Sequence, residues 1–165
     1  MIQNLDSRIT QEDLKFYQEA LKEAKQGLSH QGIPVGAVLV CEDVILGKGH
    51  NKRVQMGSTI RHGEMDCFEN AGRKKAIVYK KSTLYTTLSP CVMCSGAILL
   101  YKIPRVIIGE NINFKGEEDF LRSRGVDIIV FNDLETIQMM SAFIERCPRL
   151  WNEDIGETGK ENSSA

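Results

Sequence analysis

The stretch Ser89-Pro90-Cys91-Val92-Met93-Cys94 strongly constrains how this chain folds, because it places two thiols where a β-rich segment gives way to a helix. Thr83–Thr87 reads as a strand, and the residues from Cys91 onward read as a helix that stops before Pro104. The partial positive charge of a helix N-terminus lowers thiol pKa and favours the thiolate, which is the form that binds metal. The sequence therefore predicts a pair of metal-binding thiolates at this junction.

A third ligand candidate, His62, lies upstream in the stretch Arg61-His62-Gly63-Glu64, where a loop enters another expected helix. One imidazole and two thiolates leave a tetrahedral zinc ion with one open position, whereas structural zinc sites usually have four protein ligands. Neighbours two positions apart in a regular helix point away from each other, so His62 and Glu64 can face one ion only at an irregular helix start. Glu64 would then lie beside a metal-activated water and could move its proton, which predicts a hydrolytic centre.

Other interpretations of these residues stay open at this point. Cys91 and Cys94 could form a redox pair, although such a pair needs no partner His-x-Glu. They could also belong to a closed structural zinc site with Cys67 as a further ligand. We expect the cysteines outside the pair to be small buried residues, and the other two histidines to be structural or exposed: Cys41, Cys67, Cys147, His30 and His50.

The order of the remaining patterns predicts an α/β fold. A first helix with apolar spacing of three and four follows a capping signal at Thr10, and a hairpin follows that helix. Helices and strands then alternate, which predicts a three-layer α/β/α sandwich on a mixed sheet of about five strands, with an antiparallel opening pair and parallel later strands. The expected strands are 35–40, 44–49, 83–87, 105–110 and 126–131; the expected helices are 14–28, 62–72, 91–101, 117–122, 133–144 and 148–155, with a polar loop at 51–61.

Length and charge narrow the class of protein. The 165 residues suit a single domain, which we place at 1–157, followed by a small polar tail at 158–165 that we expect to be disordered. A net charge of −1 gives no general attraction for phosphate backbones or anionic membranes, and no apolar stretch approaches the roughly 20 residues that span a bilayer. Five cysteines without a framework pattern, and no secretory signal, favour reduced thiols in a cytosolic protein.

The pairing of His-x-Glu with a later Pro-Cys-x-x-Cys matches the signature of zinc deaminases. The chain also resembles the fungal-type cytosine deaminases from the first helix to about Glu157, through "GHNKR", "HGEMDCFENAGR", "TLYTTLSPCVMCSGAI", "GENINFKG" and "WNEDIGE". The resemblance implies a cytidine deaminase-like fold and a homodimer with one zinc ion per subunit. It implies hydrolysis of cytosine to uracil and ammonia in pyrimidine salvage, and a cytoplasmic location with the nucleus as a second one. By similarity, His62, Cys91 and Cys94 bind zinc, and Glu64 shuttles protons from the activated water.

The resemblance also assigns residues to the substrate. Asn51 would hydrogen-bond the pyrimidine ring, which suits an amide because it both donates and accepts. The Gly63 N–H would donate to the ring carbonyl, the Ser89 carbonyl would accept from the amino group, and Asp154 would contact the ring. The apolar lid over the base would consist of Phe114, Trp151 and Ile155. Asn152 departs from the family, in which an aromatic residue is expected after this tryptophan.

Two alternatives to a free-base deaminase remain: a nucleoside or transfer-RNA deaminase on the same fold, and a non-catalytic zinc module. A polynucleotide deaminase needs an open groove with basic residues that hold phosphates. The C-terminal "WNEDIGE" is acidic and aromatic instead, which would repel phosphate and cap the pocket. The basic clusters 73–75 and 80–81 are interpreted as a solvated face, so we expect no nucleic acid partner.

Overall fold

The computed structural model describes residues 6–159, and these contain a five-stranded mixed sheet with the order β2-β1-β3-β4-β5. β1 pairs antiparallel with both β2 and β3, whereas β4 lies parallel to both β3 and β5. This confirms the expected antiparallel opening hairpin and parallel later strands. The strands are β1 (Gly36–Cys41), β2 (Val44–His50), β3 (Ser82–Leu88), β4 (Arg105–Glu110) and β5 (Asp127–Val130).

The helices agree with the expected ones except for two single turns. The helices are α1 (Gln11–Ser29), α2 (Arg53–Met56), α3 (Gly63–Ala71), α4 (Ala76–Tyr79), α5 (Val92–Tyr101), α6 (Glu118–Ser123), α7 (Leu134–Arg146) and α8 (Pro148–Asp154). The prediction of a continuous loop at 51–61 was wrong, because α2 forms there. Both α2 and α4 have four residues, which is too short for an apolar repeat to be visible in the sequence.

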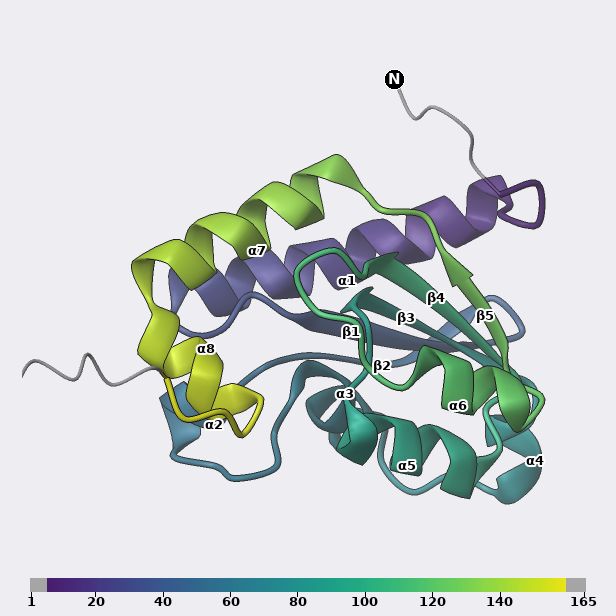
Figure 1. The fold of residues 1–165 in the computed structure, drawn as a ribbon. Coiled ribbons are helices and arrows are strands. Elements are labelled where there is room, and N and C mark those ends of the chain that lie inside the picture. The colour runs from purple at the N-terminus through teal and green to yellow at the C-terminus, as the bar shows by residue number, and fades with distance from the viewer. Residues whose placement is uncertain (1–5, 160–165) are drawn as a thin grey trace, which may run out of the picture.

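Helices cover both faces of the sheet, as Figure 1 shows, with α1 and α7 on one side and α3, α5 and α6 on the other. Alternate strand residues point to opposite faces, which separates the core into two main clusters. Val38, Tyr85 and Ile107 pack against Tyr17 and Leu21 of α1. On the opposite face, the cluster includes Ala37, Leu39, Leu84, Val106, Cys67, Ile98 and Leu121. The three-layer α/β/α architecture predicted from the sequence is confirmed.

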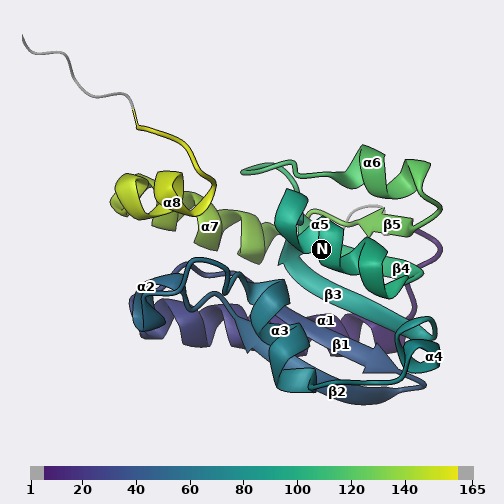
Figure 2. The ribbon, with the colours of Figure 1, turned by 90° about the horizontal axis from the view of Figure 1, so that it is seen from below.

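The pairing directions bring three chain segments to one edge of the sheet. His50 at the end of β2 lies opposite Gly36, and Thr86 near the end of β3 lies opposite Ala37. The carboxyl ends of β2 and β3 therefore meet at the same edge, and α3 and α5 contact each other on one face of the sheet, the face turned toward the viewer in Figure 2. In open α/β sheets, ligands bind outside the carboxyl ends of the strands.

α1 is fixed at its start by a capping box and by a partly buried ion pair. The Thr10 hydroxyl accepts from the Asp13 N–H, and the Asp13 carboxylate accepts from the Thr10 N–H. Asp13 also accepts from the Tyr85 hydroxyl at 2.8 Å and from the Arg105 guanidinium at 2.8 Å. These contacts connect α1 to β3 and β4, and so to the central strands of the sheet.

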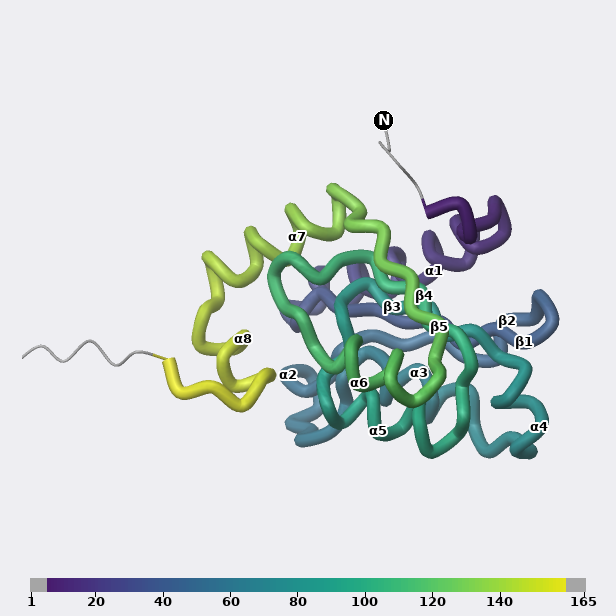
Figure 3. The backbone as a smooth tube through the Cα atoms, turned by 45° about the vertical axis from the view of Figure 1, so that its right-hand side comes forward, coloured from purple at the N-terminus to yellow at the C-terminus, as the bar shows by residue number. Residues whose placement is uncertain are grey.

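The C-terminal helix α8 returns to the edge of the sheet that carries the start of α3, and it lies beside α2 (Figure 3). Arg53 of α2 donates to the carbonyl of Glu153 and to the carboxylate of Asp154. Residues after α8 form no regular structure through 159. Most of the expected tail, 160–165, lies outside the described residues.

Candidate active site

Three side chains from two helix starts converge at the sheet edge: His62, Cys91 and Cys94. His62 precedes α3 with an extended backbone (φ −62°, ψ 164°), and Cys91 precedes α5 in a similar conformation (φ −68°, ψ 175°). The irregular helix start that the His-x-Glu spacing requires is therefore present. The three ligand atoms all lie within 4.8 Å of one another.

The spacing of these atoms fits a tetrahedral zinc ion. Zinc bonds of about 2.3 Å to sulfur and about 2.0–2.1 Å to nitrogen separate tetrahedral ligand atoms by roughly 3.5–3.8 Å. The Nδ1 atom of His62 lies 3.3 Å from the Cys91 Sγ and 3.8 Å from the Cys94 Sγ. The donor set, one imidazole with two thiols, is also one that zinc prefers. The residues can hold zinc with three protein ligands and leave a fourth position for water.

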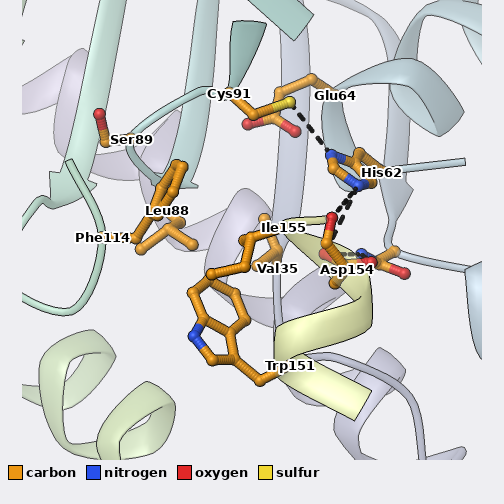
Figure 4. A pocket seen from close by; sticks show the side chains of 11 residues that line it. Val35, His62, Glu64, Leu88, Ser89, Cys91, Phe114, Trp151, Asp154 and Ile155 are labelled. Atoms are coloured by element: carbon orange, nitrogen blue, oxygen red, sulfur yellow. Dashed lines mark hydrogen bonds and ion pairs between the residues drawn. The ribbon is translucent and has the colours of Figure 1, made fainter. Parts of the chain in front are cut away.

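The imidazole of His62 contacts Asp154 on the side of the ring that faces away from Cys91 (Figure 4). Its Nε2 lies 3.1 Å from the backbone carbonyl oxygen of Asp154 and 3.5 Å from the carboxylate of the same residue. Because a carbonyl only accepts, this contact places a ring proton on Nε2, so Nδ1 is the nitrogen that can bind a metal ion once its own proton is lost. Such a second contact behind a ligand histidine fixes the ring for metal binding.

The groups of this cluster shift one another's pKa values. A hydrogen bond from the Cys94 thiol outweighs the effect of burial and, with contact to His62, lowers the pKa of Cys91 to about 4. The same hydrogen bond, together with burial and the nearby Glu64, raises the pKa of Cys94. Burial lowers the pKa of His62, but the Cys91 thiolate and the carboxylates of Asp154 and Glu64 raise it to about 9. A divalent cation would take the place of the protons that these groups share.

Glu64 lies one residue into α3 and is almost fully buried, with 3% of its surface exposed. Its Oε1 accepts a hydrogen bond of 2.8 Å from the Thr86 hydroxyl, and its Oε2 lies 3.3 Å from the Cys94 Sγ. Burial, and then the charge of the Cys91 thiolate, raise the pKa of Glu64 above its ordinary value. A carboxyl group with a raised pKa can both take and give protons near neutral pH.

A pocket adjoins the three ligands, and its walls come from segments far apart in the sequence (Figure 4). Val35 and Leu88 supply apolar contacts that sequence reasoning missed, since nothing distinguishes them from other core residues. The rings of Phe114 and Trp151 meet edge to face, with centroids 5.8 Å apart. The structure brings these predicted site residues to the lining: Asn51, His62, Glu64, Ser89, Cys91, Phe114, Trp151, Asp154 and Ile155.

Asn51 and Asp154 form one hydrogen-bonded group at the pocket wall. The Asn51 amide N–H donates to both Asp154 carboxylate oxygens at 3.1 and 3.0 Å, while its amide oxygen accepts from the Arg53 N–H. The Arg53 side chain donates to the same carboxylate at 3.1 Å. Arg53 was not predicted as a site residue. The only signal in the sequence is that Arg53 is a cation two positions after the predicted site residue Asn51.

Gly63 and Ser89 differ in their place relative to the pocket. Gly63 is not among the lining residues, and a Cβ atom there would lie 2.7 Å from the Val35 carbonyl oxygen. The Ser89 hydroxyl is hydrogen-bonded to Glu118, which does not line the pocket. What Ser89 offers to a ligand in the pocket is therefore its main chain.

The cysteines outside the metal cluster differ in burial. Cys67 is fully buried, its thiol donates to the Gly47 carbonyl, and it is not part of the ligand group, which argues against a closed four-ligand site. Cys41 is also buried. The expectation that Cys147 is buried was wrong, because it is only half-buried at the junction between α7 and α8.

Comparison with known proteins identifies the family. Residues 10–110 match the family model of the cytidine and deoxycytidylate deaminase zinc-binding region. The chain belongs to this deaminase family. The matched region contains all three zinc-ligand residues and Glu64, so the family's zinc ion is the cation that His62, Cys91 and Cys94 can hold.

Relatives within the family act on different substrates. A cytosine deaminase from Candida albicans is 51% identical over 150 residues, which are 90% of this chain and all of that protein. A tRNA-specific adenosine deaminase from Streptococcus pyogenes is 43% identical over 110 residues, which are 66% of this chain and 69% of that protein. The similarity to the cytosine deaminase therefore extends over more of the chain.

Solved structures support the same fold. A tRNA:A34 deaminase structure superposes with a TM-score of 0.62 at 25% identity, covering 72% of this chain and 98% of that one. A guanine deaminase from Nitrosomonas europaea superposes with a TM-score of 0.65 at 15% identity, covering 81% of this chain and 84% of that one. At that identity the second likeness shows the fold alone.

Among residues 6–159, no helix has the length and apolar character that crossing a membrane requires.

Proposed function

We propose that this protein is a zinc-dependent hydrolase that converts free cytosine to uracil and ammonia. The observation that carries the proposal is the arrangement of the pocket, which Glu64 and the ligands His62 and Cys91 line together with Trp151. The relative that matches nine tenths of the chain is a cytosine deaminase. We expect this activity to serve pyrimidine salvage. The thiol ligands must be reduced to bind metal, which suits the cytosol.

Zinc, when bound, acts as a Lewis acid that lowers the pKa of a water molecule toward neutrality. Glu64 supplies the base that such a water needs, because its Oε2 lies 3.3 Å from the Sγ of the ligand Cys94 while the Thr86 hydroxyl donates to Oε1. In the proposed sequence, Glu64 takes a proton from water and gives it to ring N3 as oxygen adds to C4. Glu64 then protonates the amino group with the second proton, the C4–N bond breaks, and ammonia leaves. Water thus provides the oxygen and both protons, and the carboxylate ends as it began.

The pocket offers groups that match the edges of cytosine. Asn51 and Asp154 form one hydrogen-bonding wall, and we assign both to the pyrimidine ring. The Gly63 N–H is assigned to the ring carbonyl oxygen, and the Ser89 carbonyl to the amino group. Phe114, Trp151 and Ile155 would cover the flat face of the base.

A free base fits this site better than a nucleotide within RNA. Beside Trp151, α8 carries the exposed Glu153, whose carboxylate would repel a phosphate, whereas the Asp154 carboxylate is paired with Arg53. The match to the tRNA-specific relative covers a smaller share of this chain than the match to the cytosine deaminase. The C-terminal lid is the part of the chain on which we base the choice of substrate.

A homodimer is proposed from the apolar surface beside the site. Val92 and Leu100 of α5 are 69% and 71% exposed, and Phe120 of α6 is 43% exposed. Large apolar side chains exposed together on neighbouring helices are typical of an interface. A second copy packed on α5 would lie directly behind the two thiol ligands and could support their geometry.

The proposal is tested by cytosine turnover, followed by ultraviolet absorbance, in zinc-loaded wild-type protein and in Cys91→Ala. The wild-type protein should bind one zinc per chain and release ammonia from cytosine. Cys91→Ala should lose both zinc and activity, with a lower melting temperature, because metal binding is coupled to folding. Serine substitution of the half-buried Cys147 is the matched control. A Cys91→Ala variant that retained a full equivalent of zinc would refute the ligand set.

A further inference from the structure

A buried carboxylate, that of Glu118, lies behind the pocket and takes no part in the function proposed above. Glu118 is the first residue of α6, and only 1% of its surface is exposed. Its Oε1 accepts a hydrogen bond of 2.8 Å from the Ser89 hydroxyl. Its Oε2 accepts from the Asn111 amide at 3.3 Å and lies 3.5 Å from the Arg122 guanidinium. A buried carboxylate with this many partners holds its neighbours in a fixed geometry.

Ser89 is the residue through which Glu118 reaches the active site. The Ser89 hydroxyl donates to Glu118 and accepts from the Gly116 N–H at 2.9 Å. Its hydrogen-bond donor and an acceptor lone pair are therefore both engaged by groups behind the pocket. Figure 4 shows the Ser89 hydroxyl directed away from His62 and Glu64. Ser89 lines the pocket, and Cys91 follows two residues later.

The neighbouring backbone contacts leave little freedom for this turn. The Glu117 N–H donates to the Pro90 carbonyl at 3.0 Å, and the Ser89 N–H donates to the Glu110 carbonyl. A Cβ atom at Gly116 would lie 1.9 Å from the Pro90 carbonyl oxygen, so the two segments touch at a position that only glycine allows. The turn before Cys91 is therefore packed directly against the start of α6.

We infer that Glu118 is a positioning residue, which acts through the Ser89 hydroxyl to aim the Ser89 carbonyl at the amino group of the substrate. This inference rests on the proposed cytosine deaminase function. A carbonyl at this place matters most when Glu64 protonates the amino group, because a hydrogen bond from a cationic donor is stronger than one from a neutral amine. The contact therefore strengthens toward the transition state, and its misplacement should lower kcat more than it raises KM.

The decisive variant is Ser89→Ala, because it deletes the hydroxyl and keeps the carbonyl. On zinc-replete protein, kcat for cytosine should fall by about tenfold to a hundredfold, with KM within about threefold of wild type. Pyrimidin-2-one, which is cytosine without its amino group, should inhibit the variant and the wild type equally within about twofold. A merely structural role would weaken that inhibition as well, because the whole pocket would loosen.

A second variant, Glu118→Gln, keeps the side-chain volume and removes the charge. Like Ser89→Ala, it should lower kcat for cytosine. The double variant should be no slower than Ser89→Ala alone within about twofold, because Glu118 acts through Ser89. Glu117→Ala is the matched control, since its side chain makes no cap hydrogen bond and its backbone contact to Pro90 survives.

The outcomes separate the two proposals. Wild-type kcat in Ser89→Ala, a parallel loss of pyrimidin-2-one inhibition, or independent effects that multiply in the double variant would each overturn the role of Glu118. Failure of the zinc-replete wild-type protein to release ammonia from cytosine would instead overturn the proposed function itself.

Discussion

Replacing Glu64 by glutamine separates its chemical role from its structural one. Glutamine has nearly the same shape, and its side-chain oxygen can accept the bond that Thr86 donates to Glu64. The variant should therefore fold, melt within a few degrees of wild type, and bind one zinc per chain. It loses the carboxylate whose Oε2 lies 3.3 Å from the Cys94 Sγ, and with it the group to which we assign the proton transfers.

The expected loss of rate follows from the number of proton transfers assigned to Glu64. General acid–base catalysis contributes about 10²–10⁴-fold per transfer, and the proposed sequence uses the same carboxyl group as base and then as acid. The kcat for cytosine should therefore fall by at least about 10⁴-fold, or about 5.5 kcal/mol in activation free energy. Turnover is measured by ultraviolet absorbance beside Glu69→Gln, an exposed residue on the same helix. A zinc-loaded Glu64→Gln protein within tenfold of the wild-type rate would refute the proton-transfer role.

Two other predictions concern stability and assembly. Burial alone would raise the pKa of Asp13, but the Arg105 guanidinium, the Thr10 N–H and the Tyr85 hydroxyl lower it to about 2. Because the pKa of Asp13 is lower in the folded state, its ionised carboxylate stabilises the fold at pH values above 3.8, the pKa of the unfolded chain. The contribution is up to about 2 kcal/mol for a side chain that is only 5% exposed, and it is lost as the pH falls toward 2. In urea unfolding the gap between wild type and Asp13→Asn should narrow between pH 5 and pH 2, and a constant gap would contradict this. Leu100→Asp should sediment as a monomer at concentrations where the wild type is a dimer; an unchanged dimer would exclude α5 from the interface.

The metal site could be predicted from the sequence because its chemistry depends on local spacing. His62 and Cys91 each precede a helix, and a helix start is readable from the residues on either side of it. The strands could be predicted for a similar reason, since buried strands in this chain are short apolar runs bounded by turns. The relative directions of the strands followed from the hairpin and from the helices that connect the later strands.

The contacts behind the site could not be predicted, because they join residues with no common pattern. Glu118 reads in the sequence as one of several acids in a solvated run, yet it is buried against Ser89. Arg53 reads as a loop cation, yet it holds Asp154 from 101 positions away in the chain. Only the packing of α6 and α8 onto the sheet edge brings these charges inside.

The central claim is that a covered pocket selects the free base. The most direct measurement is turnover of cytosine and cytidine side by side with one zinc-replete preparation, followed by ultraviolet absorbance. We predict release of ammonia from cytosine and none above background from cytidine, because in the proposed function Trp151 and Asp154, which line the pocket, leave no room for ribose. Comparable turnover of cytidine would show that the pocket is open, and the roles of Trp151 and Asp154 would then be wrong.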